Sequence, residues 1–101
     1  MEKRFKIEIY ARARVDVIGI VDYWENTLGT SSTPFLDDYE KALLKISASP
    51  FSHHIPKDET LKAEGYRIIP IRNYYMFYKV VDDTVQIHRV LYSKMDFSKL
   101  F

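Results

Sequence analysis

Two arginines in the last third of the chain have side chains that suit the recognition of anions. Arg67 and Arg72 lie five positions apart in an apolar run typical of a strand, so they point to opposite faces if that strand is regular. A guanidinium presents a rigid fork of N–H donors that fits a phosphate or the carboxylates of an acidic partner. The alternative interpretation for each arginine is a structural ion pair with an acid on a neighbouring element.

A tyrosine and a lysine follow at the end of the last apolar run. Tyr92 would donate a proton only beside cations that lower its pKa from about 10, and Lys94 is a cation two positions away. The favoured alternative is that Tyr92 contacts a partner protein. With Arg67 and Arg72, these two residues complete the set of candidate site residues.

The histidines predict no metal site. His53 and His54 are adjacent, and neighbouring side chains of an extended segment point apart, so the pair is a poor chelate for zinc. His88 is one position out of phase with Val85 and Ile87 and should lie on the other face of its strand. A general base is one interpretation of His88, and a partly exposed strand histidine is the favoured one. No metal or cofactor is expected.

Arg89 is in an unusual position for a charged residue. It shares the alternation of Val85, Ile87 and Leu91, which should point into the core. A buried guanidinium without a partner is costly. The sequence therefore predicts either a bulge at this point of the strand or an ion pair with a buried acid such as Asp16.

Composition predicts one folded domain spanning residues 1–101. Hydrophobic residues make up 47% of the chain and aromatic residues 15%, which is typical of folded proteins. The chain has no cysteine, so disulfides and thiolate sites are excluded. No signal peptide and no apolar run of the roughly 20 residues needed to span a membrane is recognisable. We expect a soluble, cytoplasmic protein without membrane contacts.

The formal net charge of +1 is distributed unevenly. Residues 1–14, 15–56 and 57–101 carry net charges of +3, −4 and +2, which together give the total. Basic ends around an acidic middle are compatible with a basic face toward a polyanion. A solvated surface with chance asymmetry explains the same distribution, so charge alone does not demand nucleic acid.

The first half of the chain predicts one strand and two helices. Residues 5–10 alternate apolar and charged side chains, as a half-buried strand does. Two apolar stripes at helical spacing follow: Ala13, Val17, Ile20, Trp24 and Leu28, then Phe35, Tyr39, Ala42 and Ile46. Gly29 should end the first helix, Thr33 should cap the second, and Ser49-Pro50 should end it.

The second half predicts a connecting loop and three strands. Residues 50–64 show no clean period, and strands are expected at residues 66–72, 74–81 and 84–91. Arg72-Asn73 and Asp82-Asp83 are tight-turn candidates. Pro70 indicates that its strand lies at a sheet edge or is irregular at this position. The order β-α-α-β-β-β predicts an α+β fold, with an antiparallel sheet packed against a two-helix hairpin.

Several local patterns resemble the RelE/ParE toxins of type II toxin–antitoxin systems, across nearly the whole chain. The first helix is similar to the family's A-x-x-D-L-x-x-I-x-x-Y through Ala13, Asp16, Val17, Ile20 and Tyr23. Residues 65–80 resemble G-x-R-x-x-x-V-x-N-Y-x-I-F-Y-x-V, and residues 87–96 resemble I-x-R-V-L-H-x-R-R-D. The order and spacing of these weak motifs favour the ParE-like, plasmid-stabilisation branch.

The two branches of the family imply different activities. ParE-like members inhibit growth by acting on DNA gyrase and trapping its cleaved-DNA intermediate. RelE-like members cleave mRNA in the ribosome, which requires a deprotonated 2′-hydroxyl, a neutralised phosphate and a protonated leaving oxygen. This chain departs from the nuclease pattern: Tyr75 stands where an arginine is common, the terminal cations are reduced to Lys94 and Lys99, and Phe101 ends the chain.

The resemblance therefore implies a gyrase inhibitor, held in a hetero-oligomer by a cognate antitoxin encoded by an adjacent gene. Under this interpretation Arg67, Arg72, Tyr92 and Lys94 contact the target, and the protein is not an enzyme. One alternative is a ribosome-dependent mRNA endonuclease that uses the same four residues. Another is a degenerate member that only binds its antitoxin.

Overall fold

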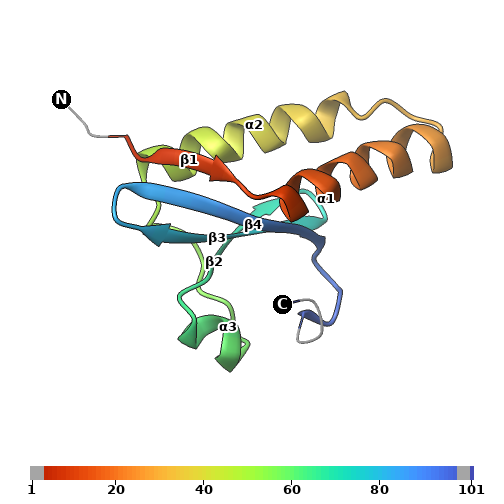
Figure 1. Ribbon diagram of the computed structural model, residues 1–101. Coiled ribbons are helices and arrows are strands. Elements are labelled where there is room, and N and C mark those ends of the chain that lie inside the picture. Colours follow the sequence, from red (N-terminus) through yellow and green to blue (C-terminus); the bar gives the residue numbers. More distant parts are fainter. Residues whose placement is uncertain (1–3, 98–100) are drawn as a thin grey trace.

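The structure is a computed structural model that describes residues 4–97 and residue 101. Its elements are β1 (Lys6–Ile9), α1 (Ala11–Asp22), the π-helical segment η1 (Tyr23–Thr27), α2 (Thr33–Ala48), α3 (Glu59–Ala63), β2 (Arg67–Ile71), β3 (Tyr74–Val81) and β4 (Thr84–Tyr92). Figure 1 shows the α1–α2 hairpin on one face of the sheet, with α3 and the C-terminal end on the other. The predicted α+β fold is confirmed.

The four strands form one sheet in the order β1-β4-β3-β2. The last three strands are antiparallel neighbours, as expected, whereas β1 pairs with β4 in parallel, so the sheet is mixed rather than purely antiparallel. Parallel pairing of β1 with β4 is possible because the helical hairpin and two strands provide the long connection that parallel strands need. Pro70 lies in the edge strand β2, as predicted.

The main core lies between the helical hairpin and the sheet. Both predicted helical stripes supply buried residues to it, with Ala13 and Ile20 from α1 and Phe35, Ala42 and Ile46 from α2. The sheet supplies Ile69, Ile71, Tyr74, Met76, Tyr78, Val85, Ile87 and Val90. Leu28 was expected to continue the stripe of α1 but is exposed, because η1 widens the helix before this position.

The opposite face of the sheet carries a smaller apolar cluster. Its buried members are Leu61, Tyr66, Ile68, Phe77 and Leu91. Leu61 belongs to α3, so the prediction of a plain loop at residues 50–64 was wrong for this short helix. Asp58 caps α3 by accepting a hydrogen bond from the Leu61 backbone N–H at 3.0 Å. A five-residue helix with one buried apolar side chain leaves no periodicity to detect.

The two tight turns predicted from the sequence are confirmed, whereas the predicted N-cap of α2 is wrong by one residue. Arg72 and Asp82 adopt positive φ angles of 53° and 55° in the two predicted turns, and Gly29 has a φ of 66° after the first helix. Ser32 rather than Thr33 precedes α2, and its hydroxyl donates to Glu25 instead of capping the helix.

In the part of the chain that the structure describes, no helix has the length and hydrophobicity to cross a bilayer.

Candidate functional site

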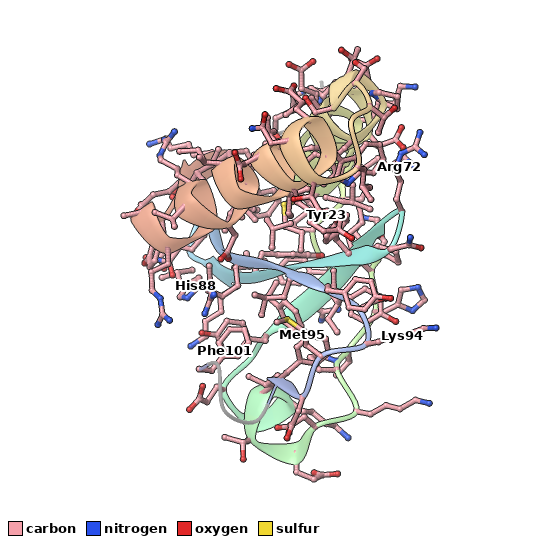
Figure 2. The ribbon with its side chains drawn as sticks, turned by 90° about the vertical axis from the view of Figure 1, so that its right-hand side faces the viewer. Tyr23, Arg72, His88, Lys94, Met95 and Phe101 are labelled. Atoms are coloured by element: carbon pink, nitrogen blue, oxygen red, sulfur yellow. The ribbon has the colours of Figure 1, made fainter. Side chains whose placement is uncertain are left out.

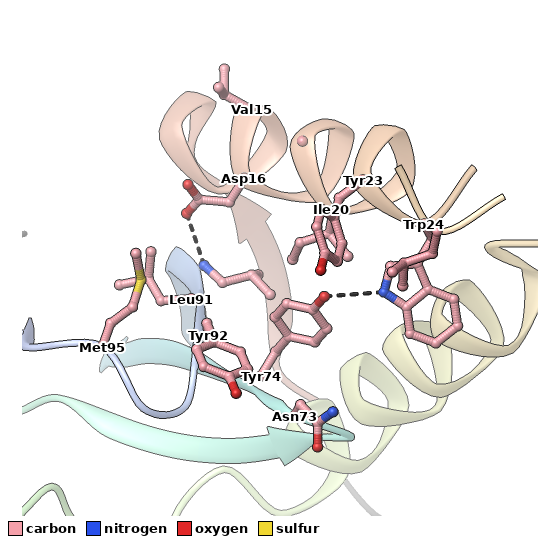
Figure 3. Close-up of a pocket in the computed structure, with 13 residues that line it drawn as sticks. Val15, Asp16, Ile20, Tyr23, Trp24, Asn73, Tyr74, Leu91, Tyr92 and Met95 are labelled. Carbon is pink, nitrogen blue, oxygen red and sulfur yellow. Dashed lines mark hydrogen bonds between the residues drawn. The ribbon is translucent and has the colours of Figure 1, made fainter. Parts of the chain in front are cut away.

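An open apolar groove runs between the α1–η1 helix and the ends of β3 and β4. Its volume is about 650 Å³. Five large apolar residues along it are 44–66% exposed: Val15, Tyr23, Leu28, Tyr92 and Met95. Contiguous exposed apolar side chains of this kind are typical of surfaces that bind another molecule. We refer to this feature as the α1–β4 groove (Figure 3).

One residue that lines the groove, Asp16, forms the ion pair predicted for Arg89. The Nε and Nη2 of Arg89 donate to the two carboxylate oxygens of Asp16 at 2.8 and 3.0 Å. Both side chains are mostly buried, at 11 and 12% exposure. Asp16 also accepts a hydrogen bond from the backbone N–H of Val90 at 2.9 Å. This hydrogen-bonded pair raises the pKa of Arg89, so the guanidinium stays charged.

The strand geometry explains why this pair forms. Phe77 is opposite Arg89 and Tyr78 is opposite Ile87, so the pairing of β3 with β4 is irregular here and His88 is the extra residue. The bulge and the ion pair, predicted as alternatives, therefore occur together. Beyond Ile87, β1 no longer covers the edge of β4, and the carboxylate of Asp16 takes the place of a strand partner for Val90.

The other end of the groove is closed by aromatic side chains. The indole N–H of Trp24 donates to the Tyr74 hydroxyl at 3.0 Å, as Figure 3 shows. The Arg72 guanidinium lies 5.8 Å from the Trp24 ring centroid. Its Nε is 2.8 Å from a carboxylate oxygen of Asp38 on α2. Arg72 therefore joins the sheet to the helical hairpin at this end.

The structure brings three of the four predicted site residues to one end of the sheet. Tyr92 packs edge-to-face against Tyr74, with ring centroids 6.3 Å apart. The turn that carries Lys94 is tied to the Arg72-Asn73 turn, because the Ser93 N–H donates to the Asn73 carbonyl at 2.8 Å. Figure 2 shows Arg72 and Lys94 on the same side of the molecule. Lys99 lies outside the described residues.

Arg67 lies apart from this group. It is at the start of β2, whereas Ile71 is the β2 residue in register with Tyr74 and Tyr92. Four residues of strand separate the two positions by about 13 Å. Arg67 Nη1 donates to the backbone carbonyls of Phe51 and His53 at 3.1 and 3.3 Å. The four residues are therefore not assembled around one point.

His88 lies on the sheet face opposite the helices, as predicted. Its Nδ1 is 3.1 Å from the Tyr66 hydroxyl and its Nε2 is 3.2 Å from the Gln86 amide oxygen. The centroid of its ring lies 4.3 Å from that of Tyr10, with an angle of 31° between the ring planes. Burial, and then the charge of Lys79, lower the pKa of His88, which favours the neutral ring. Both nitrogens are already hydrogen-bonded, so neither is presented to a substrate.

Burial and the nearby cations also lower the pKa of His53, with His54, Lys45 and Arg67 contributing in that order. No group of three or more metal-binding side chains occurs among the residues that the structure describes.

The sequence reasoning missed the residues that line the α1–β4 groove. Val15, Gly19 and Tyr23 follow one another at four-residue spacing and form a second stripe on α1, beside the core stripe. Gly19 leaves open space: a Cβ built there would meet nothing within 4 Å. A helix with apolar residues on two sides has one side without an intramolecular partner, but which side that is depends on how α1 packs on the sheet.

Comparisons with known proteins agree with this architecture. Residues 7–97 match the family described as the ParE toxin of the type II toxin–antitoxin system parDE. A structure of the chromosomal ParDE system from P. aeruginosa is similar with a TM-score of 0.73 and 13% identity, covering 91% of this chain and 99% of that chain.

The toxin–antitoxin complex RelBE2 from Mycobacterium tuberculosis is similar with a TM-score of 0.63 and 19% identity, covering 91% and 94% of the two chains. At these identities the structures establish the fold alone. A search of curated protein sequences gives no match. Because the family match spans most of its length, the chain belongs to the ParE toxin family of type II toxin–antitoxin systems.

Proposed function

We propose that this toxin inhibits growth by binding DNA gyrase, as a ParE-like protein, and that a cognate antitoxin neutralises it. The observation that carries the proposal is the contrast between a well-formed apolar groove and a scattered set of cations. An exposed groove of this size suits the binding of another protein segment. Phosphodiester cleavage instead needs cations and a proton donor converging on one phosphate.

The separation of the four candidate residues supports binding over mRNA cleavage. Arg67 is about 13 Å along its strand from the Tyr92 register, and its guanidinium is hydrogen-bonded to two backbone carbonyls. Arg72 is paired with Asp38. Both guanidinium groups are therefore engaged within the chain, which leaves them poorly placed to stabilise the negative charge that develops on a phosphate during cleavage. In this proposal Arg72, Tyr92 and Lys94 contact partner proteins.

The α1–β4 groove is proposed as the surface that the antitoxin covers. Two solved structures of similar fold are described as a ParDE toxin–antitoxin system and a RelBE2 toxin–antitoxin complex, and the antitoxin here is expected from the adjacent reading frame. Arg72 and the exposed Lys94 flank the strand side of the groove. An apolar segment with acidic residues along one flank would therefore complement it.

The direct test is to incubate the purified chain with DNA gyrase, ATP and supercoiled plasmid, and to measure linear DNA. We expect linear product that depends on the chain and increases with its concentration. A parallel arm measures transcripts by primer extension after induction in cells. Growth arrest with cleaved transcripts and no linear plasmid would identify the ribosomal nuclease instead. Neither product, with supercoiling undisturbed and growth unaffected, would identify a member that only binds its antitoxin.

A further inference from the structure

A second exposed surface lies away from the α1–β4 groove. From Lys41 to Lys57 the chain has no acidic residue, although it carries three lysines and two histidines. The same segment contains Phe51, which is 60% exposed. We refer to Lys45, Phe51, His53 and Arg67 together as the basic corner.

The loop that carries Phe51 is held in place by the sheet. The buried Tyr78 hydroxyl donates to the Pro50 carbonyl at 2.6 Å, and burial raises the pKa of Tyr78 to about 12, so the hydroxyl keeps its proton. Arg67 donates to the carbonyls of Phe51 and His53 on the other side. His54 and Ile68 exchange two backbone hydrogen bonds, at 3.2 and 2.8 Å. These bonds fix the loop before any partner arrives, which lowers the entropic cost of binding.

Charge and shape around Phe51 are those of a protein-binding anchor. The Arg67 guanidinium lies 5.3 Å from the centroid of the Phe51 ring, and the Phe5 ring packs edge-on at 6.0 Å. Exposed aromatic and arginine side chains are enriched among the residues that dominate protein interfaces. Lys45 and Arg67 place positive charge next to His53. A partner that fits this corner therefore carries carboxylates around an apolar pocket.

The basic corner is independent of the groove. Arg67 begins β2, whereas the groove borders the opposite end of the sheet, where Asn73, Tyr74 and Tyr92 lie. No member of the corner lines the groove. The molecule is only 41 Å in its longest dimension, so a large enzyme bound at the corner and an antitoxin bound in the groove would compete for space.

We propose that the basic corner docks on an acidic surface of the toxin's protein target, with Phe51 as the inserted anchor and Arg67 as the residue that positions it. This inference rests on the proposed function in requiring a protein target. It goes further by naming the surface that the target binds and the chemistry that the target must present.

The test uses two variants of the full chain with matched controls. Phe51→Ser removes the anchor, and its control Ile18→Ser removes another apolar side chain, 68% exposed on α1 and outside the groove lining. Lys45→Glu reverses a charge in the last turn of α2, and its control Lys62→Glu does the same in the last turn of α3. Four readouts are compared: thermal unfolding, growth arrest on induction, linear plasmid formed with purified gyrase, and binding of the protein encoded by the adjacent gene, followed by Trp24 fluorescence.

We expect Phe51→Ser and Lys45→Glu each to weaken growth arrest and plasmid linearisation by about tenfold or more, as loss of an interface anchor does. Unfolding temperature and binding of the adjacent gene product should stay unchanged, and both controls should behave as the wild type. If the wild type arrests growth without linearising plasmid or cleaving transcripts, loss of arrest in these variants would support the corner and point to another acidic protein as the target. Cleaved transcripts that disappear in both variants would instead assign the corner to RNA and overturn the inference.

Three further results would overturn the inference. If both variants arrest growth as strongly as the wild type does, the target does not bind the corner. Loss of binding to the adjacent gene product with arrest retained would assign the corner to the antitoxin. Absence of arrest by the wild-type chain would mean that there is no target to dock, and it would remove the proposed function as well.

Discussion

The two faces of the sheet are both apolar, but the chain covers them differently. On the face away from the hairpin, α3 and Phe97 pack over the cluster of Phe77, and the ring of Phe97 is 4.9 Å from that of Phe77. On the hairpin face, α1 and α2 cover the centre of the sheet and leave the α1–β4 groove open at one end. The apolar cluster on one face is therefore covered by segments of this chain, whereas no described segment covers the α1–β4 groove on the other face.

The named polar groups are hydrogen-bonded within the chain on both faces, so the two faces differ in their apolar side chains. His88 on the covered face has both ring nitrogens bonded within the chain. In the groove the carboxylate of Asp16 and the indole N–H of Trp24 are also hydrogen-bonded within the chain, whereas Val15, Tyr23 and Met95 are exposed. The exposed side chains that line the groove are therefore mainly apolar, as expected for a protein-docking surface.

The largest expected effect is on the covered face. Phe77→Ala removes a fully buried ring, and we expect it to lower the free energy of unfolding by about 3–5 kcal/mol. Met95→Ala at the rim of the groove is the matched apolar truncation and should change stability by less than about 0.5 kcal/mol. Urea denaturation followed by circular dichroism measures both. Equal losses would show that the groove rim is part of the folded core.

A smaller loss is expected at Asp16, which lines the groove. Asp16→Asn replaces one carboxylate oxygen by an NH2 group that donates, so either Arg89 Nη2 loses its acceptor or Arg89 Nε and the Val90 N–H lose theirs. We expect a loss of about 2–3 kcal/mol, as for hydrogen bonds to charged groups, measured in the same denaturation experiment. Asp22→Asn, on the exposed end of α1, is the control and should be neutral. No loss in Asp16→Asn would mean that the buried pair does not hold α1 on β4.

Filling the groove separates folding from binding. Gly19→Leu places a side chain where a Cβ meets no atom within 4 Å, and leucine favours the helix over glycine by about 0.8 kcal/mol. The free protein should therefore be as stable as the wild type or slightly more stable. Its affinity for the adjacent gene product, measured by titration calorimetry, should fall at least about tenfold. Gly19→Ala, which adds one methyl group, is the control that should retain binding.

The smallest effect concerns pH. The pKa of His88 is lowered from its ordinary value of 6.5 in the folded protein, so the unfolded chain binds more protons between the two values. Stability that is fully present above pH 6.5 should therefore decline as the pH falls below it. His53 acts in the same direction. Thermal unfolding from pH 8 to pH 5 should show a shallower decline for His88→Gln than for the wild type, and identical declines would contradict this assignment.

Much of the fold could be predicted because its signals are local. The helical stripes, the alternation of Val85 and Ile87, the turn at Asp82 and the edge position of Pro70 each follow from periodicity or backbone chemistry. The pairing of Asp16 with Arg89 followed from the cost of burying an unpaired guanidinium. The parallel pairing of β1 with β4 was not predictable, since it depends on contacts between segments almost eighty residues apart.

The candidate site was only partly predictable. Arg72, Tyr92 and Lys94 do share one end of the sheet, but Arg67 was grouped with them although strand register places it at the other end. The α1–β4 groove was missed because exposure is a property of packing, and Val15 or Met95 looks the same in sequence whether it is buried or not. The stripe of Val15, Gly19 and Tyr23 becomes informative only once α1 is placed on the sheet.

We propose that this toxin poisons gyrase by binding it, and that an antitoxin bound in the α1–β4 groove prevents this activity. One measurement addresses it: linear plasmid produced by gyrase, ATP and the chain, titrated with the adjacent gene product. We predict linear DNA with the wild-type chain, its suppression near equimolar antitoxin, and persistent linear DNA when Gly19→Leu replaces the wild type. Absence of linear DNA, or equal suppression of the wild type and Gly19→Leu, would contradict the account.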